Sequence, residues 1–365
     1  MLKRLYVDNY RCLVNFEAHF GPRQLLLGSN GSGKTTVFDV LALLRDFCVR
    51  GEPGDRFVGP TRTRWQTVSE QVFELDVSGN GGEYTLRLVV DAWGRPERPV
   101  VLGEEVHFCG KPIFRFINSE VSLFDDSCTK VGEYPFDMHR SALATINERL
   151  NNSKLTWFKR WLDGLLIVAP DPKRMASISE TESKNPTQSL SNFSDWYRHI
   201  RLDNDDRDYW KTLSDLFEGF DRFRFEDAGT RRRELKACFR DRNPPTEYIL
   251  EELSDGQRVL IGLYAILHFA LKPGTTVCFD EPDNFIALRE IQPWLLEVLD
   301  RTDEDEQGTQ VLIASHHPVL LDYMGFKEGI RLDRPEGRQV RVERFTDPSF
   351  TGLSAAELVA RGWEA

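Results

Sequence analysis

One stretch of sequence decides the fold of this 365-residue chain: Gly28-Ser29-Asn30-Gly31-Ser32-Gly33-Lys34-Thr35. It matches the pattern GxxxxGK[ST], in which glycines let backbone N–H groups curl around a phosphate. A short apolar run, residues 24–27, precedes it and predicts a buried strand. Apolar residues at helical spacing predict a helix over residues 35–47. The order of strand, glycine loop and helix is the context that a phosphate-binding loop (Walker A) requires.

The Walker A residues predict a nucleotide site. Lys34 is expected to neutralise charge on the β- and γ-phosphates, and the Thr35 hydroxyl to ligate Mg²⁺. The candidate nucleotide-binding residues of this segment are Gly28, Ser29, Asn30, Gly31, Ser32, Gly33, Lys34, Thr35 and Thr36.

A second apolar strand, Val277-Cys278-Phe279, ends in the adjacent acids Asp280 and Glu281. Two neighbouring carboxylates repel unless a cation lies between them, which favours a metal site over a purely structural strand end. Read together with the phosphate loop, this is a Walker B site. Asp280 is expected to hold Mg²⁺, and Glu281 to orient or deprotonate the attacking water as general base.

Two further motifs lie on either side of Walker B. Leu253 precedes Ser254, Asp255, Gly256 and Gln257, which open an apolar helix whose N-terminus can receive an anion. Taken alone, they could equally be a serine-capped helix. Beyond another buried strand, the run Ser315-His316-His317-Pro318 offers His316 as a γ-phosphate contact, and His317 is the less favoured candidate.

These motifs, in this order, resemble the cassette-type ATPases of the SMC, RecF and OLD (overcoming lysogenization defect) group, of the AAA_21 or AAA_15 type. Residues 253–257 are similar to that group's LSGGQ signature, with Asp255 in place of a glycine. The opening strand pair around Asn9-Tyr10-Arg11 also resembles the group, which adds Arg11 as a candidate nucleotide contact. The resemblance implies an α/β P-loop NTPase fold with an ABC-ATPase core, ATP and Mg²⁺ as cofactors, and Lys34, Glu281 and His316 as catalytic residues.

Three parts of the chain are expected. The antiparallel subdomain is indicated by two strand-like runs around Gly79-Asn80-Gly81-Gly82, and the helical lobe by helical patterns over 140–163 and 191–218. The expected parts are residues 1–135 (Walker A half of the core with a β-rich antiparallel subdomain), 136–228 (inserted, mainly helical lobe) and 229–365 (signature, Walker B and switch histidine).

Composition excludes several classes of protein. A net charge of −11 excludes a broadly cationic nucleic-acid binder. Six cysteines without a CxxC pair suggest neither a disulfide framework nor a zinc site. The longest apolar stretch, residues 259–271, is too short to span a bilayer, and the first residues lack a signal peptide's apolar run. A cytoplasmic protein without membrane contact is expected.

The resemblance also implies how the chain works. In the superfamily, one protomer's phosphate loop faces the signature of another, so a chain with one set of motifs is expected to form an ATP-sandwich homodimer, with a higher oligomer also open. The leading hypothesis is a sensor ATPase of a bacterial anti-phage or toxin module that controls a separately encoded effector such as a nuclease. Substitution of Glu281 by Gln is expected to trap the closed dimer.

Two alternatives remain at this stage. The first is a RecF/SMC-like DNA-binding ATPase in repair, with Arg62, Arg64 and Trp65, or the run 231–233, as DNA contacts; solvated surface charge explains the same residues equally well. The second is a transporter subunit, disfavoured because the insertion between Walker A and the signature is long. Gln66 and Gln71 are both open as a Q-loop glutamine.

Overall fold

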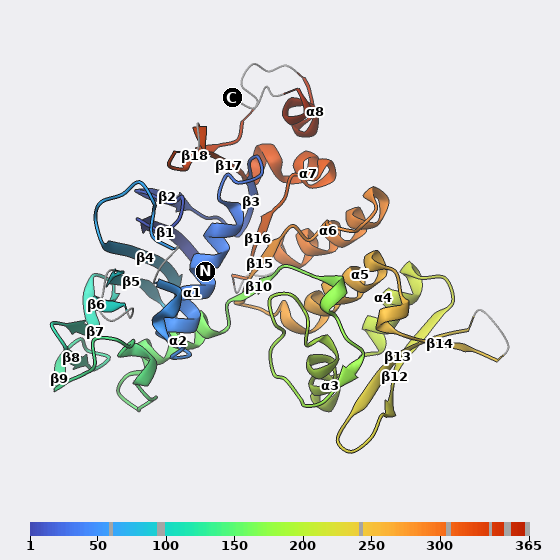
Figure 1. Cartoon of the computed structure of the whole chain (residues 1–365), viewed down its shortest axis with the longest axis horizontal. Helices are drawn as coiled ribbons and strands as arrows, with labels where there is room; N and C mark the ends of the chain where they lie inside the picture. The colour runs from blue at the N-terminus through green and yellow to red at the C-terminus, as the bar shows by residue number, and fades with distance from the viewer. Residues whose placement is uncertain are drawn as a thin grey trace.

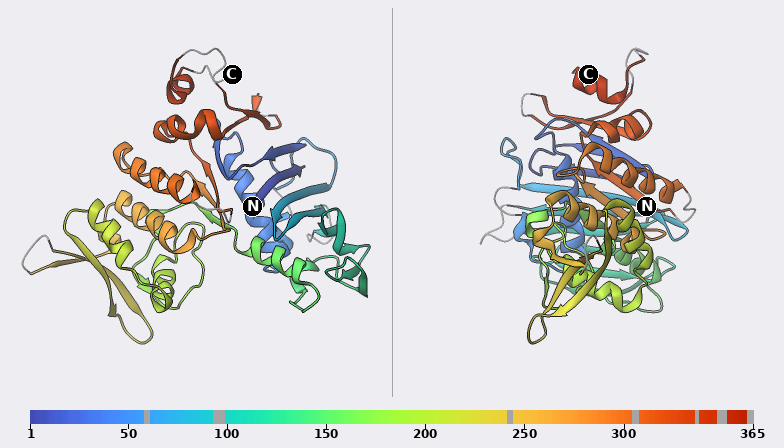
Figure 2. Two further views of the ribbon diagram at one scale, coloured as in Figure 1. Left: turned by 180° about the vertical axis from the view of Figure 1, so that it is seen from behind. Right: turned by 90° about the vertical axis from the view of Figure 1, so that its right-hand side faces the viewer.

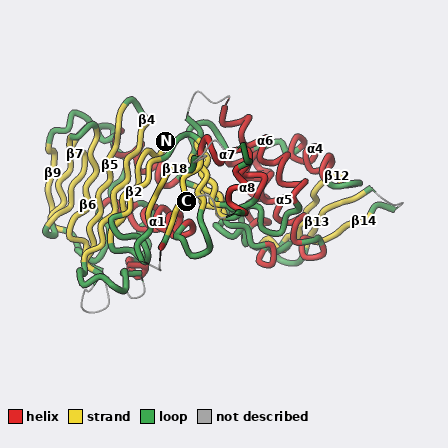
Figure 3. Tube along the Cα trace, turned by 90° about the horizontal axis from the view of Figure 1, so that it is seen from above, coloured by secondary structure: helices red, strands yellow, loops and turns green. Residues whose placement is uncertain are grey.

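The computed structural model describes residues 1–57, 61–92, 99–240, 244–303, 308–335, 338–346 and 352–361. A parallel sheet runs through the middle of the molecule, with an antiparallel sheet at one side and a helical lobe at the other (Figure 1). Seen from above, the strands of the antiparallel sheet gather at one end, and most of the helices lie toward the other end together with the strands of the helical lobe (Figure 3). The nucleotide motifs belong to the central part.

The central sheet has six strands in the order β10-β15-β16-β3-β17-β18. All neighbours are parallel except β18, which pairs antiparallel with β17. The strands β15 and β16 are buried at every position, as expected for a sheet covered on both faces. The bounds are β3 Arg23–Leu27, β10 Leu166–Val168, β15 Thr276–Asp280, β16 Gln310–Ala314, β17 Gly329–Asp333 and β18 Arg341–Arg344.

Helices cover both faces of this sheet (Figure 2). On one face, Leu26 and Leu312 pack in the same core as helix α1 and the antiparallel sheet. On the other face, Leu25 and Ile313 pack with α5, α6 and α7. The helices are α1 Lys34–Cys48, α5 Asp255–Ala265, α6 Leu288–Asp303, α7 Pro318–Glu328 and the C-terminal α8 Ala355–Ala360; a π-helical turn, Ile266–Ala270, continues α5.

The antiparallel sheet has eight strands in the order β2-β1-β4-β5-β6-β7-β8-β9. Helix α2, Ser153–Asp163, packs on it through Trp157, which stacks on Tyr84 with 4.9 Å between ring centroids. The strands are β1 Leu2–Asp8, β2 Phe16–His19, β4 Glu70–Gly79, β5 Gly82–Asp91, β6 Val100–Phe108, β7 Lys111–Ile117, β8 Glu120–Phe124 and β9 Lys130–Pro135. The opening strand pair and the hairpin around Gly79 are therefore confirmed.

The helical lobe carries its own small sheet, in which β13 pairs with β11, β12 and β14. Its elements are β11 Ile178–Ser179, α3 Phe193–Asp203, α4 Arg207–Leu216, β12 Phe220–Asp227, β13 Arg233–Phe239 and β14 Thr246–Ile249. This sheet extends past residue 228, so the lobe does not end where the sequence suggested. Within the described residues, no helix combines the length and apolarity that crossing a bilayer needs.

Two expectations about the middle of the chain need correction. The helix expected from residue 140 begins only at Ser153, because the Asn152 side chain bonds the backbone of Arg149 and Asn147 instead (2.7 and 3.0 Å). The strand β10 lies inside the range expected for the inserted lobe, yet it pairs with β15 in the central sheet. Three apolar residues are too few to signal a strand by periodicity.

Candidate nucleotide-binding site

The phosphate loop leaves the carboxyl end of β3 and enters α1. Its three glycines, Gly28, Gly31 and Gly33, have φ values of 145°, 80° and 107°, in the region that favours glycine. A Cβ on Gly28 would lie 2.3 Å from the carbonyl oxygen of Leu332, so the loop also packs too closely on β17 for a side chain. The N-terminus of α1 therefore opens directly into the cavity above the loop.

Lys34 is buried inside the loop. Its Nζ donates hydrogen bonds to the carbonyl oxygens of Gly28 (2.6 Å) and Ser29 (3.3 Å). Burial lowers the pKa of Lys34, while the charges of Glu281 and Asp280 act in the opposite direction. An ammonium group desolvated in this way gains from an anion placed beside it.

Asp280 ends β15 and faces α1. The Thr35 hydroxyl donates to its Oδ1 at 3.3 Å, so the two groups expected at Mg²⁺ are adjacent. Burial, with the nearby Glu281 charge, raises the pKa of Asp280 to about 6. A buried carboxylate beside a hydroxyl fits a hard cation that takes oxygen ligands. Among the described residues, no group of three or more His, Cys, Asp or Glu side chains could hold a metal ion.

Glu281 follows in a left-handed backbone conformation, with φ of 48°. Its backbone N–H donates to the carbonyl oxygen of Ala314 (2.8 Å), and Asn284 Nδ2 donates to its Oε2 (2.8 Å). Non-glycine residues adopt this conformation rarely, and such residues cluster at functional sites. The backbone and Asn284 thus hold the carboxylate at the cavity wall.

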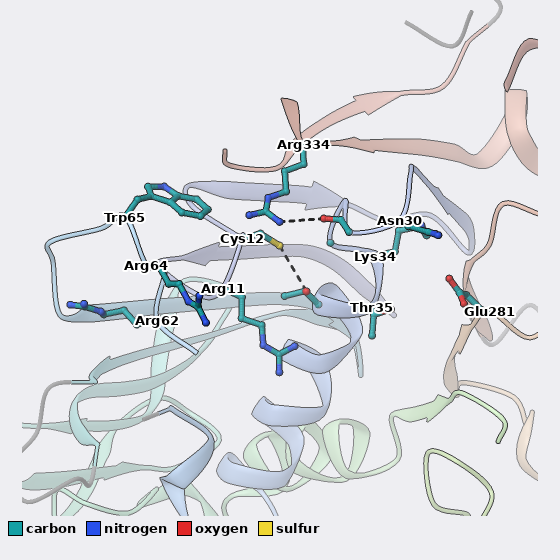
Figure 4. A pocket seen from close by; sticks show the side chains of 13 residues that line it. Arg11, Cys12, Asn30, Lys34, Thr35, Arg62, Arg64, Trp65, Glu281 and Arg334 are labelled. Atoms are coloured by element: carbon teal, nitrogen blue, oxygen red, sulfur yellow. Dashed lines mark hydrogen bonds between the residues drawn. The ribbon is translucent and has the colours of Figure 1, made fainter. Parts of the chain in front are cut away.

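One cavity of about 700 Å³ is lined by Lys34, Thr35 and Glu281 together with residues from three parts of the chain outside the Walker motifs (Figure 4). Arg11, an expected contact, lines it and pairs with Asp39 of α1. The lining residues are Arg11, Cys12, Asn30, Gly31, Gly33, Lys34, Thr35, Thr36, Arg62, Arg64, Trp65, Glu281 and Arg334.

Arg62, Arg64, Trp65 and Arg334 were not expected at the nucleotide site. The sequence shows Arg62, Arg64 and Trp65 as a basic patch. It does not show that these residues line the same cavity as the phosphate loop. Of the two Q-loop candidates, Gln71 is fully buried and donates to the Asn9 carbonyl oxygen at 2.9 Å, a structural contact. Gln66 does not line the cavity.

The signature residues lie apart from this cavity. Ser254 caps α5: its Oγ accepts from the Gln257 backbone N–H (3.2 Å), and the Gln257 side chain bonds back. A Cβ on Gly256 would lie 2.8 Å from the carbonyl oxygen of Phe285, so the helix start packs tightly on the segment after Glu281. None of Ser254, Asp255, Gly256 and Gln257 lines the cavity. The chain brings Walker A and Walker B together but not its own signature.

His316 is exposed and lines a second cavity, of about 390 Å³, with Gly28, Ser29 and Asn30. It therefore borders the phosphate loop but not the cavity of Lys34. His317 instead caps α7, accepting from the Val319 N–H at 3.3 Å, and burial lowers its pKa. Of the two histidines, His316 is the one that borders the phosphate loop, and its contact with a γ-phosphate stays a prediction.

Comparisons with known proteins agree with this architecture. A family profile described as "AAA domain, putative AbiEii toxin, Type IV TA system" (AAA_21) matches residues 131–322, more than half of the chain. The OLD nuclease of Thermus scotoductus (strain ATCC 700910 / SA-01) is 46% identical over 44 residues, which span 12% of this chain and 8% of that protein.

Solved structures extend the likeness to the whole chain. The SMC head domain from Thermotoga maritima matches with a TM-score of 0.50 and 13% identity, covering 95% of this chain and 99% of that one. An SMC head bound to the C-winged-helix domain of ScpA matches with a TM-score of 0.56 and 13% identity, covering 94% of this chain and 97% of that one. The Pyrococcus furiosus SMC head domain with an extended coiled coil, bound to the ScpA C-terminal domain, matches with a TM-score of 0.54 and 12% identity. This match covers 100% of this chain and 98% of that one. At these identities the likeness shows the fold, an SMC-head type of ABC-ATPase domain. By the profile match, the chain belongs to the AAA_21 family of ATPases.

Proposed function

We propose that the chain binds ATP with Mg²⁺ in the 700 Å³ cavity and hydrolyses it. The observation that carries this proposal is the convergence of two distant motifs. Thr35 of Walker A and Asp280 of Walker B are in hydrogen-bond contact, and Lys34 and Glu281 line the same cavity. These positions support a phosphoryl-transfer site in which the four residues would supply the binding, metal and general-base groups.

The roles follow from the positions of the groups. Lys34 would release the loop carbonyls and neutralise the β- and γ-phosphates, while the α1 N-terminus donates N–H groups to them. Thr35 and Asp280 would hold Mg²⁺, which when bound supplies positive charge to the phosphates. Glu281, fixed through Asn284, would accept a proton from the attacking water.

We further infer a homodimer that closes on ATP. The helix start at Ser254 and Gly256 offers a hydroxyl and N–H groups but lies outside the chain's own cavity. A second copy, related by two-fold symmetry, would place its signature over the phosphates and leave its own cavity open to the first chain. Turnover would then require both chains.

The proposed biological role is control of a separately encoded effector in an anti-phage or toxin module, in the cytoplasm. The matched family is described as a putative toxin of a Type IV toxin–antitoxin system, which supports the toxin-module setting of this role. Affinity purification of the Glu281→Gln protein in ATP from its host should recover a stoichiometric partner that Lys34→Ala does not recover. Recovery of DNA without a protein partner would contradict this role.

A DNA-repair clamp finds little support among the basic clusters. Arg232 pairs with Glu180 at 2.6 Å, and Arg233 pairs with Asp227, so acidic neighbours offset much of the charge of the 231–233 run. The other cluster, residues 62–65, belongs to the nucleotide cavity. We therefore do not adopt the clamp.

Phosphate release from ATP tests the enzymatic proposal. The wild-type protein should release phosphate at a rate per chain that rises with protein concentration, because the second signature comes from a partner. Glu281→Gln should retain ATP affinity and lose turnover by roughly 100-fold or more, as expected for loss of a general base. Lys34→Ala should lose both ATP affinity and turnover. A Glu281→Gln protein with unchanged turnover would refute the assignment.

A further inference from the structure

The end of the cavity away from Glu281 is built from an aromatic ring and arginines. Figure 4 shows Trp65 there, with Arg334 between it and the phosphate loop. The Arg334 guanidinium carbon lies 5.7 Å from the centroid of the Trp65 ring, a cation–π contact. Arg62 and Arg64 line the same part.

The loop that carries Trp65 is tied to the start of the chain. Arg11 N–H donates to the Thr61 carbonyl oxygen at 2.6 Å, and Thr63 N–H donates to Asn9 Oδ1 at 3.3 Å. Because Arg11 also lines the cavity, these bonds fix the height of the loop above the phosphate site. The ring is therefore held by a defined backbone, as a binding wall needs.

Arg334 is anchored in the same way on the opposite wall. Its Nε donates to the Arg338 carbonyl oxygen at 2.8 Å, and Nη1 reaches the Gly31 carbonyl oxygen at 3.5 Å. Gly31 belongs to the phosphate loop, so Arg334 links that loop to the Trp65 ring. The two flat groups lie at one end of a cavity whose other end holds the phosphate-binding residues.

Trp65 is also unusual in its exposure. Within the described part of the chain it is the one exposed tryptophan, with 47% of its surface accessible. Every hydrogen-bonding group on the side chains of Trp65, Arg62, Arg64 and Arg334 is a donor. Such a wall offers stacking surface and positive charge, which suits the face of a nucleobase and the nearest phosphate.

We propose that the Trp65 ring and the Arg334 guanidinium form the base-binding wall of the nucleotide site, stacking on the base of ATP while Lys34 holds its phosphates. The inference rests on the proposed nucleotide site and adds the residues that distinguish ATP from its phosphates alone. The residues 62–65 then contact the nucleotide and not DNA.

Calorimetric titration with Mg-ATP and with Mg-tripolyphosphate, which lacks the base and sugar, tests the proposal. Trp65→Ala should weaken ATP binding by on the order of tenfold, the loss of one base–aromatic stack, and leave tripolyphosphate binding unchanged. Trp65→Phe should keep most of the ATP affinity. Val68→Ala, at a side chain 53% exposed that does not line the cavity, is the matched control and should bind both ligands like the wild type.

Two results would overturn the base contact, and a third would overturn the nucleotide site itself. Equal weakening of ATP and tripolyphosphate by Trp65→Ala would mean a displaced loop and would overturn the base contact. Unchanged ATP affinity of the Trp65→Ala protein would also overturn the base contact. If that protein no longer retained duplex DNA, the loop would instead be assigned to nucleic-acid binding. If the wild-type protein binds neither ligand, the nucleotide site itself is wrong.

Discussion

At the scale of single residues, Asp280 carries an energetic cost that the nucleotide-free protein cannot relieve. It is 7% exposed, and burial raises its pKa from 3.8 to about 6. The hydroxyl of Thr35 offsets only part of this penalty. Because the pKa is raised in the folded state, folding binds extra protons between about pH 4 and 6, and the ionised carboxylate destabilises the protein above that window.

Asp280→Asn should therefore stabilise the protein in the absence of nucleotide and metal. At pH 8 the free energy of unfolding should rise by on the order of 1–3 kcal/mol, and the gain should shrink as the pH falls through 6 and vanish below about pH 3, where Asp280 is protonated in both states. Chemical denaturation in EDTA across this pH range measures it. Asp215→Asn, at an exposed position of α4, controls for the loss of a negative charge. A gain that grows as the pH falls would contradict the account.

The sequence predicts some cavity residues better than others for a physical reason. Lys34, Thr35, Asp280 and Glu281 belong to motifs whose local backbone fixes their geometry, and the structure brings them to one place. Trp65 reaches the cavity through pairing of residues far apart in the chain, such as the bridge of Tyr10 with Arg62. Arg334 arrives through the pairing of β17 with β3. No local pattern encodes such contacts.

At the scale of elements, the start of α5 and the segment after Walker B form one packed unit. The Phe285 carbonyl oxygen would lie 2.8 Å from a Cβ on Gly256, and Phe285 itself has φ of 73°. Asn284, the neighbour of Phe285, holds the Glu281 carboxylate. A change at the signature helix can therefore reach Glu281, the proposed general base, through this segment.

Gly256→Ala should displace the Phe285 carbonyl and disturb Glu281. ATP turnover should fall by on the order of tenfold through misplacement of the base, with ATP affinity held near the wild-type value. Steady-state kinetics and an ATP titration measure the two quantities. Gly103→Ala, where an added Cβ meets nothing within 4 Å, is the control. Loss of ATP affinity equal to the loss of turnover would mean that the variant disrupts the cavity instead.

Some helices and strands could be predicted from their sequence, and others could not. The strand and helix around the phosphate loop and the hairpin of β4 and β5 are regular and bounded by glycines, so their patterns sufficed. The strand β10 is too short to be recognised from its sequence. In residues 147–152, the side chain of Asn152 bonds the backbone of Arg149 and Asn147, and the segment is not helical. The lobe sheet, with β12 and β13, depends on pairing across a turn.

At the scale of the whole molecule, one chain carries two separate parts of a nucleotide site: the cavity with the Walker residues, and the signature. Among the described residues, none of the signature residues at Ser254 lines the cavity that holds Lys34 and Glu281. In the proposed homodimer, two chains related by two-fold symmetry would complete both sites at once. ATP would then favour the closed dimer by the free energy of contacts that exist only when both chains are present.

Light scattering of the Glu281→Gln protein in saturating Mg-ATP tests this claim most directly. The account predicts a mass of two chains with ATP and of one chain without it, since hydrolysis no longer reopens the dimer. The Ser254→Arg/Glu281→Gln double variant should bind ATP and stay at one chain, because its signature can no longer approach the phosphates. A Glu281→Gln protein that binds ATP and keeps the mass of a single chain would contradict the account.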